Sequence, residues 1–410
     1  MAEDDQTIHL ISAHDGGNGF MKDQVNDSRY IFPSVMSEVL PGKELETIDI
    51  NDTDSVETTL DDFLNKMDVT INSESLNESG RYFVGEQATI GGTTPINFNV
   101  NSTEGKSSSD ISLVCLFSLL SYVALKQYYS LNSTIPDHLN VIVDKMATAL
   151  PIDEIKLAGV QSAFTQRFTS NNHQVTINNF NVPVKIDLSF TNVFVDPEGV
   201  AAVTGLIFDP EYLNYRQGEI FDDLIEEYDL DSFTGKDILT AGNVLTIDIG
   251  DGTIDLAVTN KGTRVPNENR SILSGVGNVA ENAIAALRQA YPVIAPMDRQ
   301  TFMQIANRDR GANDKESHVY KQYLDQQTII LERQILEQVK DFHRDLHGQI
   351  GMIILCGGGA SLLKQHFNSS FKKEIDKLFP LSEPYILWVD SQYSQQLNLD
   401  GLMVRAKIMK

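Results

Sequence analysis

The hydrophobic pattern of the chain is built from short, mostly apolar segments that end in glycine-rich turns. Residues 245–259, LTIDIGDGTIDLAVT, predict two strands joined by the tight turn 250–253, where glycine permits positive φ. Residues 7–13 predict another strand, which leads into the glycine-rich turn 15–19 and a further strand. A similar turn, 357–361, follows a fully apolar strand. Each of these turns therefore lies at the end of a predicted strand.

Longer segments carry helical periodicity or are apolar throughout. Residues 111–128 are apolar almost all round and predict a buried helix, with N-cap residues in 107–110. An apolar stripe predicts a helix over 320–347, and further helices are expected to start at Asp153, Val200, Leu362 and Gln395. The turn 274–278 is expected to lead into another helix, with apolar residues from Val279 on. Further strands are predicted at 81–88, 139–143, 174–177, 182–188, 193–195, 352–355 and 385–389. The order strands, helix, strand occurs twice, which predicts a duplicated α/β domain with mixed sheets.

Composition narrows the possible partners and compartment. The 410 residues have a net charge of −25, which argues against direct binding to a nucleic-acid backbone or to anionic lipid. Cys115 and Cys356 lie in apolar segments and are predicted to be buried free thiols. Because the N-terminus is acidic and the apolar stretch 111–125 is too short to span a bilayer, we expect a cytoplasmic protein without a membrane segment.

Two acidic, polar stretches interrupt the pattern. Residues 41–78 are interpreted as surface strands and loops of a small subdomain, or as a solvated insertion. Residues 209–240 are interpreted as an insertion or a linker into the second half, and 91–109 as a polar loop.

Carboxylates at the glycine-rich turns are the candidate chemistry. A strand rarely carries Asp248 and Asp255 for packing alone, since a buried unpaired carboxylate is costly, whereas a cation or a phosphate would explain them. Asp15 and Asp248 could hold hydrated Mg²⁺, which needs few protein carboxylates, and Lys22 could neutralise a phosphate. The turn 357–361 lacks charge, which suits a ribose or a base. Glycine also lets backbone N–H groups approach phosphate oxygens closely.

The sequence lacks one common nucleotide-binding pattern and contains a relaxed form of another. The chain has no GxxxxGK[ST] sequence, which excludes a Walker loop. The pattern Gly275-x-Gly277-x-x-Ala280 matches a relaxed dinucleotide fingerprint, and it equally fits a glycine turn that opens a helix near a nucleotide.

These motifs resemble those of the superfamily of actin, sugar kinases and DnaK-type chaperones. Its first phosphate motif is similar to Asp15-x-Gly17-x-Gly19-x-x-Lys22. Its second phosphate motif is similar to Asp248-x-Gly250-x-Gly252-Thr253-x-Asp255, and its adenosine motif to Gly357-Gly358-Gly359-Ala360. The segments 32–34, 82–88, 149–154 and 197–199 resemble the ParM-type plasmid segregation actins, and Asn398-x-x-Gly401 fits the closing helix of the superfamily. The chain departs from many relatives at Gly16, where they have an apolar residue.

The resemblance implies an actin-like two-domain α/β fold, made of duplicated ribonuclease H-like domains with a nucleotide cleft between them. Domain I would span 1–195 with a small subdomain inserted at about 30–105, and domain II would span 196–390. Residues 391–410 would form a closing helix that packs back on domain I.

The resemblance also implies the site residues. The nucleotide would be bound by the glycine-rich turns and the start of one helix, that is by Asp15, Gly17, Asn18, Gly19, Lys22, Gly250, Asp251, Gly252, Thr253, Gly275, Gly277, Asn278, Gly357, Gly358, Gly359 and Ala360. Asp15 and Asp248 would face the metal. Glu154 and Asp248 would be catalytic, with Glu154 positioning the attacking water. Asp153 is adjacent and could take that role instead, and Glu154 could equally be a helix N-terminal charge that complements the dipole.

The function implied is hydrolysis of ATP or GTP with Mg²⁺, coupled to filament assembly of the protein with itself. Proteins of this kind move plasmid copies apart and contact a ParR-like adaptor protein bound to centromere DNA, so that DNA binding is delegated. The alternative in the same superfamily is a sugar- or acetate-kinase-type phosphotransferase. A DnaK-type chaperone would need a peptide-binding domain after about residue 380, and the chain is too short for one there. A scaffold that binds nucleotide without turnover remains as a further alternative.

Overall fold

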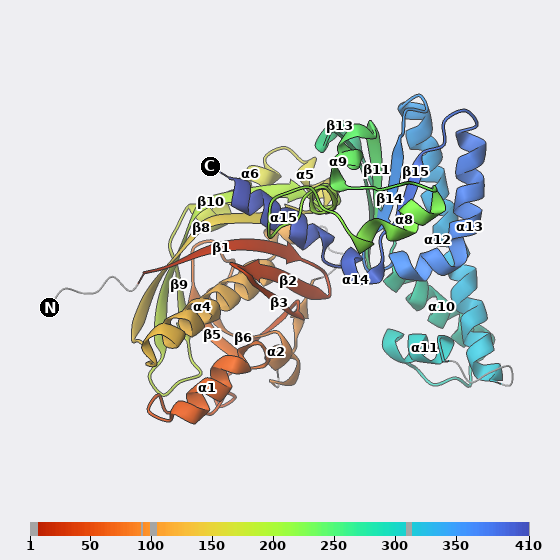
Figure 1. The fold of residues 1–410 in the computed structure, drawn as a ribbon. Coiled ribbons are helices and arrows are strands. Elements are labelled where there is room, and N and C mark those ends of the chain that lie inside the picture. The colour runs from red at the N-terminus through yellow and green to blue at the C-terminus, as the bar shows by residue number, and fades with distance from the viewer. Residues whose placement is uncertain (1–6, 92, 99–104, 309–313, 410) are drawn as a thin grey trace. The chain divides into compact units, whose positions relative to one another are not determined.

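The computed structural model describes residues 7–91, 93–98, 105–308 and 314–409. The chain divides into two compact units (Figure 1). Unit 1 comprises residues 1–197 and 399–410, and unit 2 comprises residues 198–398. The chain therefore leaves unit 1, builds the whole of unit 2, and returns to unit 1 at its end.

The described part of unit 1 contains a ten-stranded mixed sheet in the order β3-β2-β1-β8-β10-β9-β5-β6-β4-β7. Its strands are β1 (Thr7–Gly16), β2 (Phe20–Val25), β3 (Ser28–Pro33), β4 (Val35–Glu38), β5 (Met67–Asn72), β6 (Gly80–Val84), β7 (Ile96–Asn97), β8 (His138–Leu150), β9 (His173–Ile177) and β10 (Val184–Pro197). β1, β8 and β10 run parallel to one another, and β2 returns antiparallel to β1. Parallel strands end at the same edge of a sheet, so the segments after β1, β8 and β10 share that edge.

The helices of unit 1 cover this sheet. They are α1 (Thr53–Asp61), α2 (Glu86–Ile90), α3 (Gly105–Ser108), α4 (Asp110–Asn132), α5 (Ile152–Ile155) and α6 (Val160–Thr169), with a 3₁₀ turn at Phe63–Asn65. Figure 1 shows α4 lying along β1 and β2. Its side chains from Ile111 to Leu125 are buried, as the sequence predicted, and Ser109 accepts a hydrogen bond from the backbone N–H of Ile111.

α4 is longer than the predicted helix over 111–128, because it continues through polar residues to Asn132 and ends at Ser133 in the left-handed conformation. Among the described residues it is the one helix long and apolar enough to cross a membrane by length and composition. However, 83% of its most apolar window is buried inside the protein, which is what a core helix shows.

Two strand assignments in unit 1 differ from the sequence prediction. The segments predicted as separate strands at 182–188 and 193–195 form one strand, β10, because it pairs along its whole length with β8. The strand predicted over 81–88 stops at Val84, where Gly85 adopts a φ of 65° and α2 follows. A short helix and a short strand also lie within 91–109, which was predicted as a loop.

The acidic stretch 41–78 is not a solvated insertion throughout. It contains α1 and β5, and β5 lies between β6 and β9 in the sheet. Met67, Val69 and Ile71 alternate along β5 and are fully buried, so the segment contributes to the core of unit 1. The acidic side chains around it hid this alternation in the sequence.

Unit 2 has a five-stranded sheet in its described part, in the order β13-β12-β11-β14-β15. The strands are β11 (Asn243–Ile249), β12 (Ile254–Asn260), β13 (Thr263–Ile272), β14 (Met352–Cys356) and β15 (Tyr385–Trp388). Its helices are α7 (Val200–Ile207), α8 (Asp222–Glu227), α9 (Gly235–Thr240), α10 (Val276–Ala290), α11 (Arg299–Ala306), α12 (Lys315–Asp345), α13 (Ala360–Leu378) and α14 (Ser391–Ser394), with a 3₁₀ turn at Glu219–Phe221. The sequence analysis missed β13, which is short of apolar residues, and α11, which is only eight residues long.

The acidic stretch 209–240 is likewise more than a linker. It folds into the 3₁₀ turn, α8 and α9, and its apolar residues Ile220, Phe221, Leu224 and Phe233 are buried. They pack with α7 and with β14 in a second core of unit 2, which includes Cys356. Both cysteines are buried free thiols, as predicted.

The closing segment, predicted as a helix over 391–410, is two helices. α14 ends at Ser394 within unit 2, and α15 spans Leu397–Ile408. From Leu399 on, α15 belongs to unit 1. There Asp400 accepts a hydrogen bond from Arg29 at 2.6 Å, and Arg405 donates to Asp196 at 3.2 Å.

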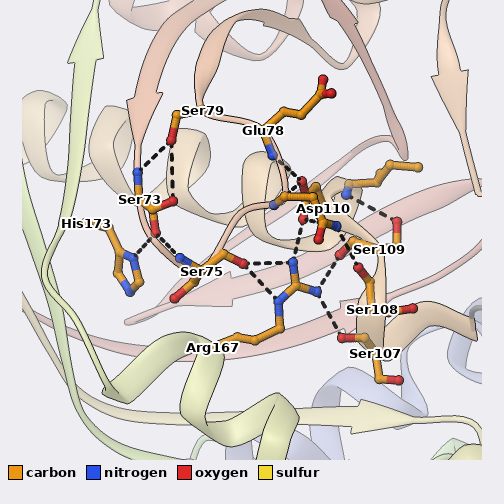
Figure 2. Close-up of polar contacts among 12 residues, drawn as sticks. Ser73, Ser75, Glu78, Ser79, Ser107, Ser108, Ser109, Asp110, Arg167 and His173 are labelled. Carbon is orange, nitrogen blue, oxygen red and sulfur yellow. Dashed lines mark hydrogen bonds and ion pairs between the residues drawn. The ribbon is translucent and has the colours of Figure 1, made fainter.

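A buried histidine gives unit 1 a pH-dependent stability. His173 Nε2 lies 2.9 Å from the Phe168 carbonyl oxygen, which can only accept, so Nε2 carries the proton. His173 Nδ1 accepts from Ser73 Oγ at 2.7 Å (Figure 2). Burial lowers the pKa of His173 below its ordinary value of 6.5, against the hydrogen bond to Phe168. The unfolded chain then takes up a proton at a higher pH than the folded one.

We therefore expect the free energy of unfolding to fall as the pH drops from about 7.5 through the unfolded pKa to about 5. His173→Gln keeps polar groups at the site but does not titrate, so its unfolding free energy should fall less over this range. Urea unfolding at several pH values measures both slopes. Above about pH 8 the imidazole is neutral in both states, so the two slopes should agree there. Equal slopes at acid pH would contradict the assignment.

Candidate functional site

The β1–β2 hairpin of unit 1 holds the first candidate motif. Asp15 pairs with Lys22 across the two strands, and Lys22 Nζ lies 3.8 Å from Asp15 Oδ2. Ser34 fixes the turn between them, because its Oγ donates to the Gly17 carbonyl at 2.6 Å and its N–H donates to the Gly19 carbonyl at 3.1 Å. The hairpin thus presents a carboxylate, a lysine and a braced glycine turn together.

The two hairpins need glycine at positions 17 and 250 for the same steric reason, a close approach of the backbone. A Cβ on Gly17 would lie 2.6 Å from the Phe20 carbonyl oxygen, and a Cβ on Gly250 would lie 2.8 Å from the Thr253 carbonyl oxygen. Neither glycine has a positive φ, so the positive φ predicted for the turn 250–253 is wrong at Gly250. What glycine permits here is the close return of the chain three residues later.

This difference leads to a prediction about stability. Gly250→Ala forces a methyl group against the Thr253 carbonyl oxygen and is expected to destabilise the protein by about 1–3 kcal/mol. Gly19→Ala is the matched control, because no atom lies within 4 Å of a Cβ there. Its stability should be unchanged, or raised by up to about 1 kcal/mol through the unfolded state. Urea-unfolding midpoints measure both, and equal midpoints for the two variants would contradict the packing argument.

The β11–β12 hairpin of unit 2 places two carboxylates opposite each other. Asp248 and Asp255 are cross-strand partners in the ladder. Asp255 accepts hydrogen bonds from Ser271 Oγ at 2.6 Å and from Thr253 Oγ1 at 3.2 Å, and Asp248 accepts from Asn398 Nδ2 at 2.9 Å. Like charges directly opposite on a sheet repel, and a bound cation would offset that repulsion. The hydrogen bonds of Asp255 therefore stabilise the hairpin and the neighbouring strand. Asp248 is instead oriented by Asn398, which lies outside the hairpin.

The other predicted turns of unit 2 pack onto this hairpin. The first turn of α10 bonds to it, with Val276 N–H donating to the Gly250 carbonyl at 3.1 Å and Gly277 N–H to the Asp251 carbonyl at 2.8 Å. From the third turn, Gly359 N–H donates to the Ile249 carbonyl at 2.9 Å. A side chain at Gly275 or Gly357 would strike the backbone of the hairpin.

These glycines therefore allow three segments to meet at one place. The residues that the structure brings together in unit 2 are Asp248, Gly250, Asp251, Gly252, Thr253, Gly275, Gly277, Asn278, Gly357, Gly358, Gly359 and Ala360. This contact favours the interpretation of Gly275–Asn278 as a glycine turn that opens a helix beside the same site, over a separate dinucleotide fingerprint. The Asp251 carboxylate itself accepts from Arg299 of α11 at 2.8 Å, which the sequence did not indicate.

A pocket of about 630 Å³ in unit 2 lies beside the third turn. Ser361 and Leu362 of α13 line one side, and α11 and α12 contribute Met303, His318 and Lys321. This volume falls in the range of small-molecule sites, about 300–1,000 Å³. The sequence analysis missed the pocket because it depends on how three successive helices, α11, α12 and α13, pack together.

Glu154 lies in unit 1, in the short helix α5 after the end of β8. β8 neighbours β1, so Glu154 and the Asp15 turn follow adjacent parallel strands. Its carboxylate accepts hydrogen bonds from the backbone N–H groups of Lys106 and Ser107, each at 2.8 Å. Glu154 thus caps α3 rather than complementing only its own helix. The adjacent Asp153 is about half exposed and pairs with Lys156 at 3.2 Å.

A buried polar network lies directly behind the first hairpin. His14 Nδ1 lies 2.7 Å from Asp23 Oδ1, and His14 Nε2 lies 2.7 Å from Ser112 Oγ in the first turn of α4. Burial raises the pKa of the Asp23 carboxyl, while the neighbouring His14 lowers it. The order Ser, His, Asp is that of a hydrolytic triad, but all three side chains are buried, which fits a brace between β1, β2 and α4.

The donor set suits a metal that is held together with a phosphate. In the described residues, no three His, Cys, Asp or Glu side chains form a group that could hold a metal ion by themselves. Mg²⁺ usually takes one or two carboxylates plus phosphate oxygens and water, so a single carboxylate such as Asp15 in one unit or Asp248 in the other suits a Mg²⁺–nucleotide better than a metal site made only of protein groups.

The chain is similar to known proteins in part of its sequence and in its fold. Residues 246–369 match the family model described as the C-terminal part of the archaeal MreB-like actin homologue. No curated protein sequence matches the chain. Among solved structures, actin-like protein Alp7A is similar at a TM-score of 0.66 and 15% identity, covering 98% of this chain and 96% of Alp7A. The chain has an actin-like fold.

Two further structures with the actin-like fold extend the comparison. A non-polymerisable quadruple mutant of pCBH ParM has a TM-score of 0.58 and 18% identity, over 98% of this chain and all of that one. ParM of Bacillus thuringiensis with ATP has a TM-score of 0.58 and 15% identity, over 98% of each chain. The resemblance to ParM-type actin-like proteins that the motifs indicated is therefore confirmed, and the two-domain α/β fold with it.

Proposed function

We propose that the protein binds ATP or GTP with Mg²⁺, hydrolyses it, and couples hydrolysis to its own assembly into filaments. The observation that carries the proposal is the repeated hairpin. Each unit has a strand–glycine turn–strand element in which a carboxylate precedes a glycine. At that glycine a Cβ would clash with the backbone, so no larger residue fits. The similarity to the solved structure of a ParM with ATP supports nucleotide as the ligand.

The chain's own groups have distinct tasks in this proposal. Lys22 and the backbone N–H groups of the two turns would contact phosphate oxygens, and Asp15 and Asp248 would hold the metal, directly or through its water. Bound Mg²⁺ neutralises charge that develops on the phosphates. Glu154 would orient a water and accept its proton, and its two backbone hydrogen bonds fix the carboxylate for that task. The 630 Å³ pocket of unit 2 would take the base.

The biological role proposed is plasmid DNA segregation in the cytoplasm. The acidic chain would act through a ParR-like adaptor that binds the centromere DNA, because a net charge of −25 disfavours direct contact with DNA. Self-association is supported by the similarity to a ParM whose mutant is described as non-polymerisable.

Pelleting and negative-stain electron microscopy test the proposal most directly. The protein should form sedimenting filaments with Mg²⁺ and ATP or GTP, and none when the metal is chelated. Phosphate release in the same samples should follow filament formation. If the nucleotide instead phosphorylates a sugar or acetate and no polymer forms, the kinase alternative is correct. If nucleotide binds without release of phosphate and without polymer, the protein is a scaffold.

A further inference from the structure

Arg167 of unit 1 forms hydrogen bonds to the segment around α3, which Glu154 caps. Arg167 lies in α6 and its side chain is 15% exposed. It makes five hydrogen bonds (Figure 2). Nε and Nη2 donate to the Ser75 carbonyl at 3.1 and 3.0 Å, and Nη1 donates to the Ser107 and Ser109 carbonyls, each at 2.9 Å. Nη2 also donates to Asp110 Oδ1 at 2.5 Å.

The guanidinium has five N–H donors, and this arrangement gives each of them an acceptor. Three different segments are joined as a result: α6, the loop between β5 and β6, and the junction of α3 with α4. Asp110 strengthens the junction, because it also accepts from the backbone N–H groups of Asn77 at 2.8 Å and Glu78 at 3.3 Å. A lysine has three donors and no fixed fork, so it could not make the same set.

Ser107 connects this cluster to Glu154. Its carbonyl accepts from Arg167, and its own N–H donates to Glu154 Oε2 at 2.8 Å. The neighbouring Lys106 N–H donates to Glu154 Oε1 at 2.8 Å. A side chain at Gly105 would overlap the Glu154 carboxylate, so the segment and the carboxylate are in close contact. Any shift of α3 therefore moves the two donors that orient Glu154.

We infer that Arg167 is a positioning residue for Glu154, acting through the backbone of Ser107. The inference rests on the proposed function, in which Glu154 orients the attacking water. The two residues would have different roles. Glu154 would contact the attacking water, and Arg167 would hold the backbone segment whose N–H groups keep the Glu154 carboxylate in place. Arg167 itself is saturated by protein acceptors and has no donor left for a nucleotide.

The test compares Arg167→Met and Arg167→Lys with Arg81→Met. Arg81 also makes a bidentate ion pair with a buried aspartate, Asp68, at 2.8 Å, but it lies in β6 and contacts neither α3 nor Glu154. Hydrogen–deuterium exchange of the peptide covering 105–109 should be faster in both Arg167 variants, more so in Arg167→Met, and unchanged in Arg81→Met. This readout needs no nucleotide. Thermal unfolding shows which variants remain folded.

Kinetics then separate positioning from a general loss of stability. Arg167→Met should lower kcat for phosphate release about tenfold with little change in nucleotide affinity, since a displaced catalytic group slows the chemical step. In a Glu154→Ala background the same change should have no further effect on kcat. Additive effects, or unchanged exchange at 105–109 in a folded variant, would overturn the inference. If Glu154→Ala lowers turnover and Arg167→Met does not, only the inference fails. If the wild type releases no phosphate, the proposed function fails and the inference with it.

Discussion

Glu154→Ala is expected to slow phosphate release about 100-fold while filaments still form. General base catalysis by a placed carboxylate contributes at least about that factor, and alanine removes the group that, in the proposed function, would accept the proton of the attacking water. Nucleotide binding and assembly do not depend on that proton transfer, so both should persist. Filaments of the variant should also last longer after nucleotide is added, because the bound nucleotide stays intact.

The matched control for this variant is the next residue. Asp153→Ala removes an adjacent carboxylate that is about half exposed and paired with Lys156, so we expect less than about a twofold change in rate. Phosphate release from pelleted filaments measures both variants. A larger loss in Asp153→Ala than in Glu154→Ala would move the catalytic role to Asp153. Unchanged release in Glu154→Ala would reject the role assigned to this carboxylate.

Asp248→Asn is expected to weaken nucleotide binding about tenfold or more in the presence of Mg²⁺. The substitution keeps an oxygen that can accept from Asn398 but removes the charge that would attract the metal. The loss should therefore depend on the metal. Wild-type affinity should fall sharply when Mg²⁺ is chelated, whereas the affinity of the variant should change little.

Asp255→Asn is the control on the partner strand. Its carboxylate accepts from Ser271 and Thr253, so its replacement should lower stability by about 1–3 kcal/mol and change affinity less than Asp248→Asn does. Titration of the wild type and both variants with a fluorescent nucleotide, with and without chelator, gives all six affinities. Metal-dependent binding that survives in Asp248→Asn would show that this carboxylate does not serve the metal.

The sequence predicted the elements whose pattern is local. The hairpin over 245–259 and the buried helix from residue 111 formed where alternation and apolar content placed them. The acidic stretches were misjudged because burial there is decided by partners far along the chain. β5 enters the core only when β6 and β9 pair with it, and Phe221 only when α7 and the sheet of unit 2 cover it.

The candidate site shows the same limit. Motif spacing identified the glycines of the turns, but not the reason for them, since the close return of the Thr253 carbonyl onto Gly250 is a tertiary contact. Ser34 and Asn398 were noted only within motifs, and their hydrogen bonds to Gly17 and Asp248 depend on the fold. Arg299 and Arg167 carried no sequence signal, because both act on partners that are remote in the chain.

The path of the chain through the two units has a consequence for synthesis. Unit 2 is one continuous segment, whereas unit 1 needs α15, which follows all of unit 2. On the ribosome, unit 2 can therefore fold while unit 1 still lacks the partners that α15 supplies to Arg29 and Asp196. Once unit 2 is folded, its residues are no longer flexible. The conformational entropy lost when α15 joins unit 1 is then smaller than for an unfolded connection of the same length. Unit 1 would thus gain these contacts only after all of unit 2 has been translated, which delays a complete unit 1 until that point.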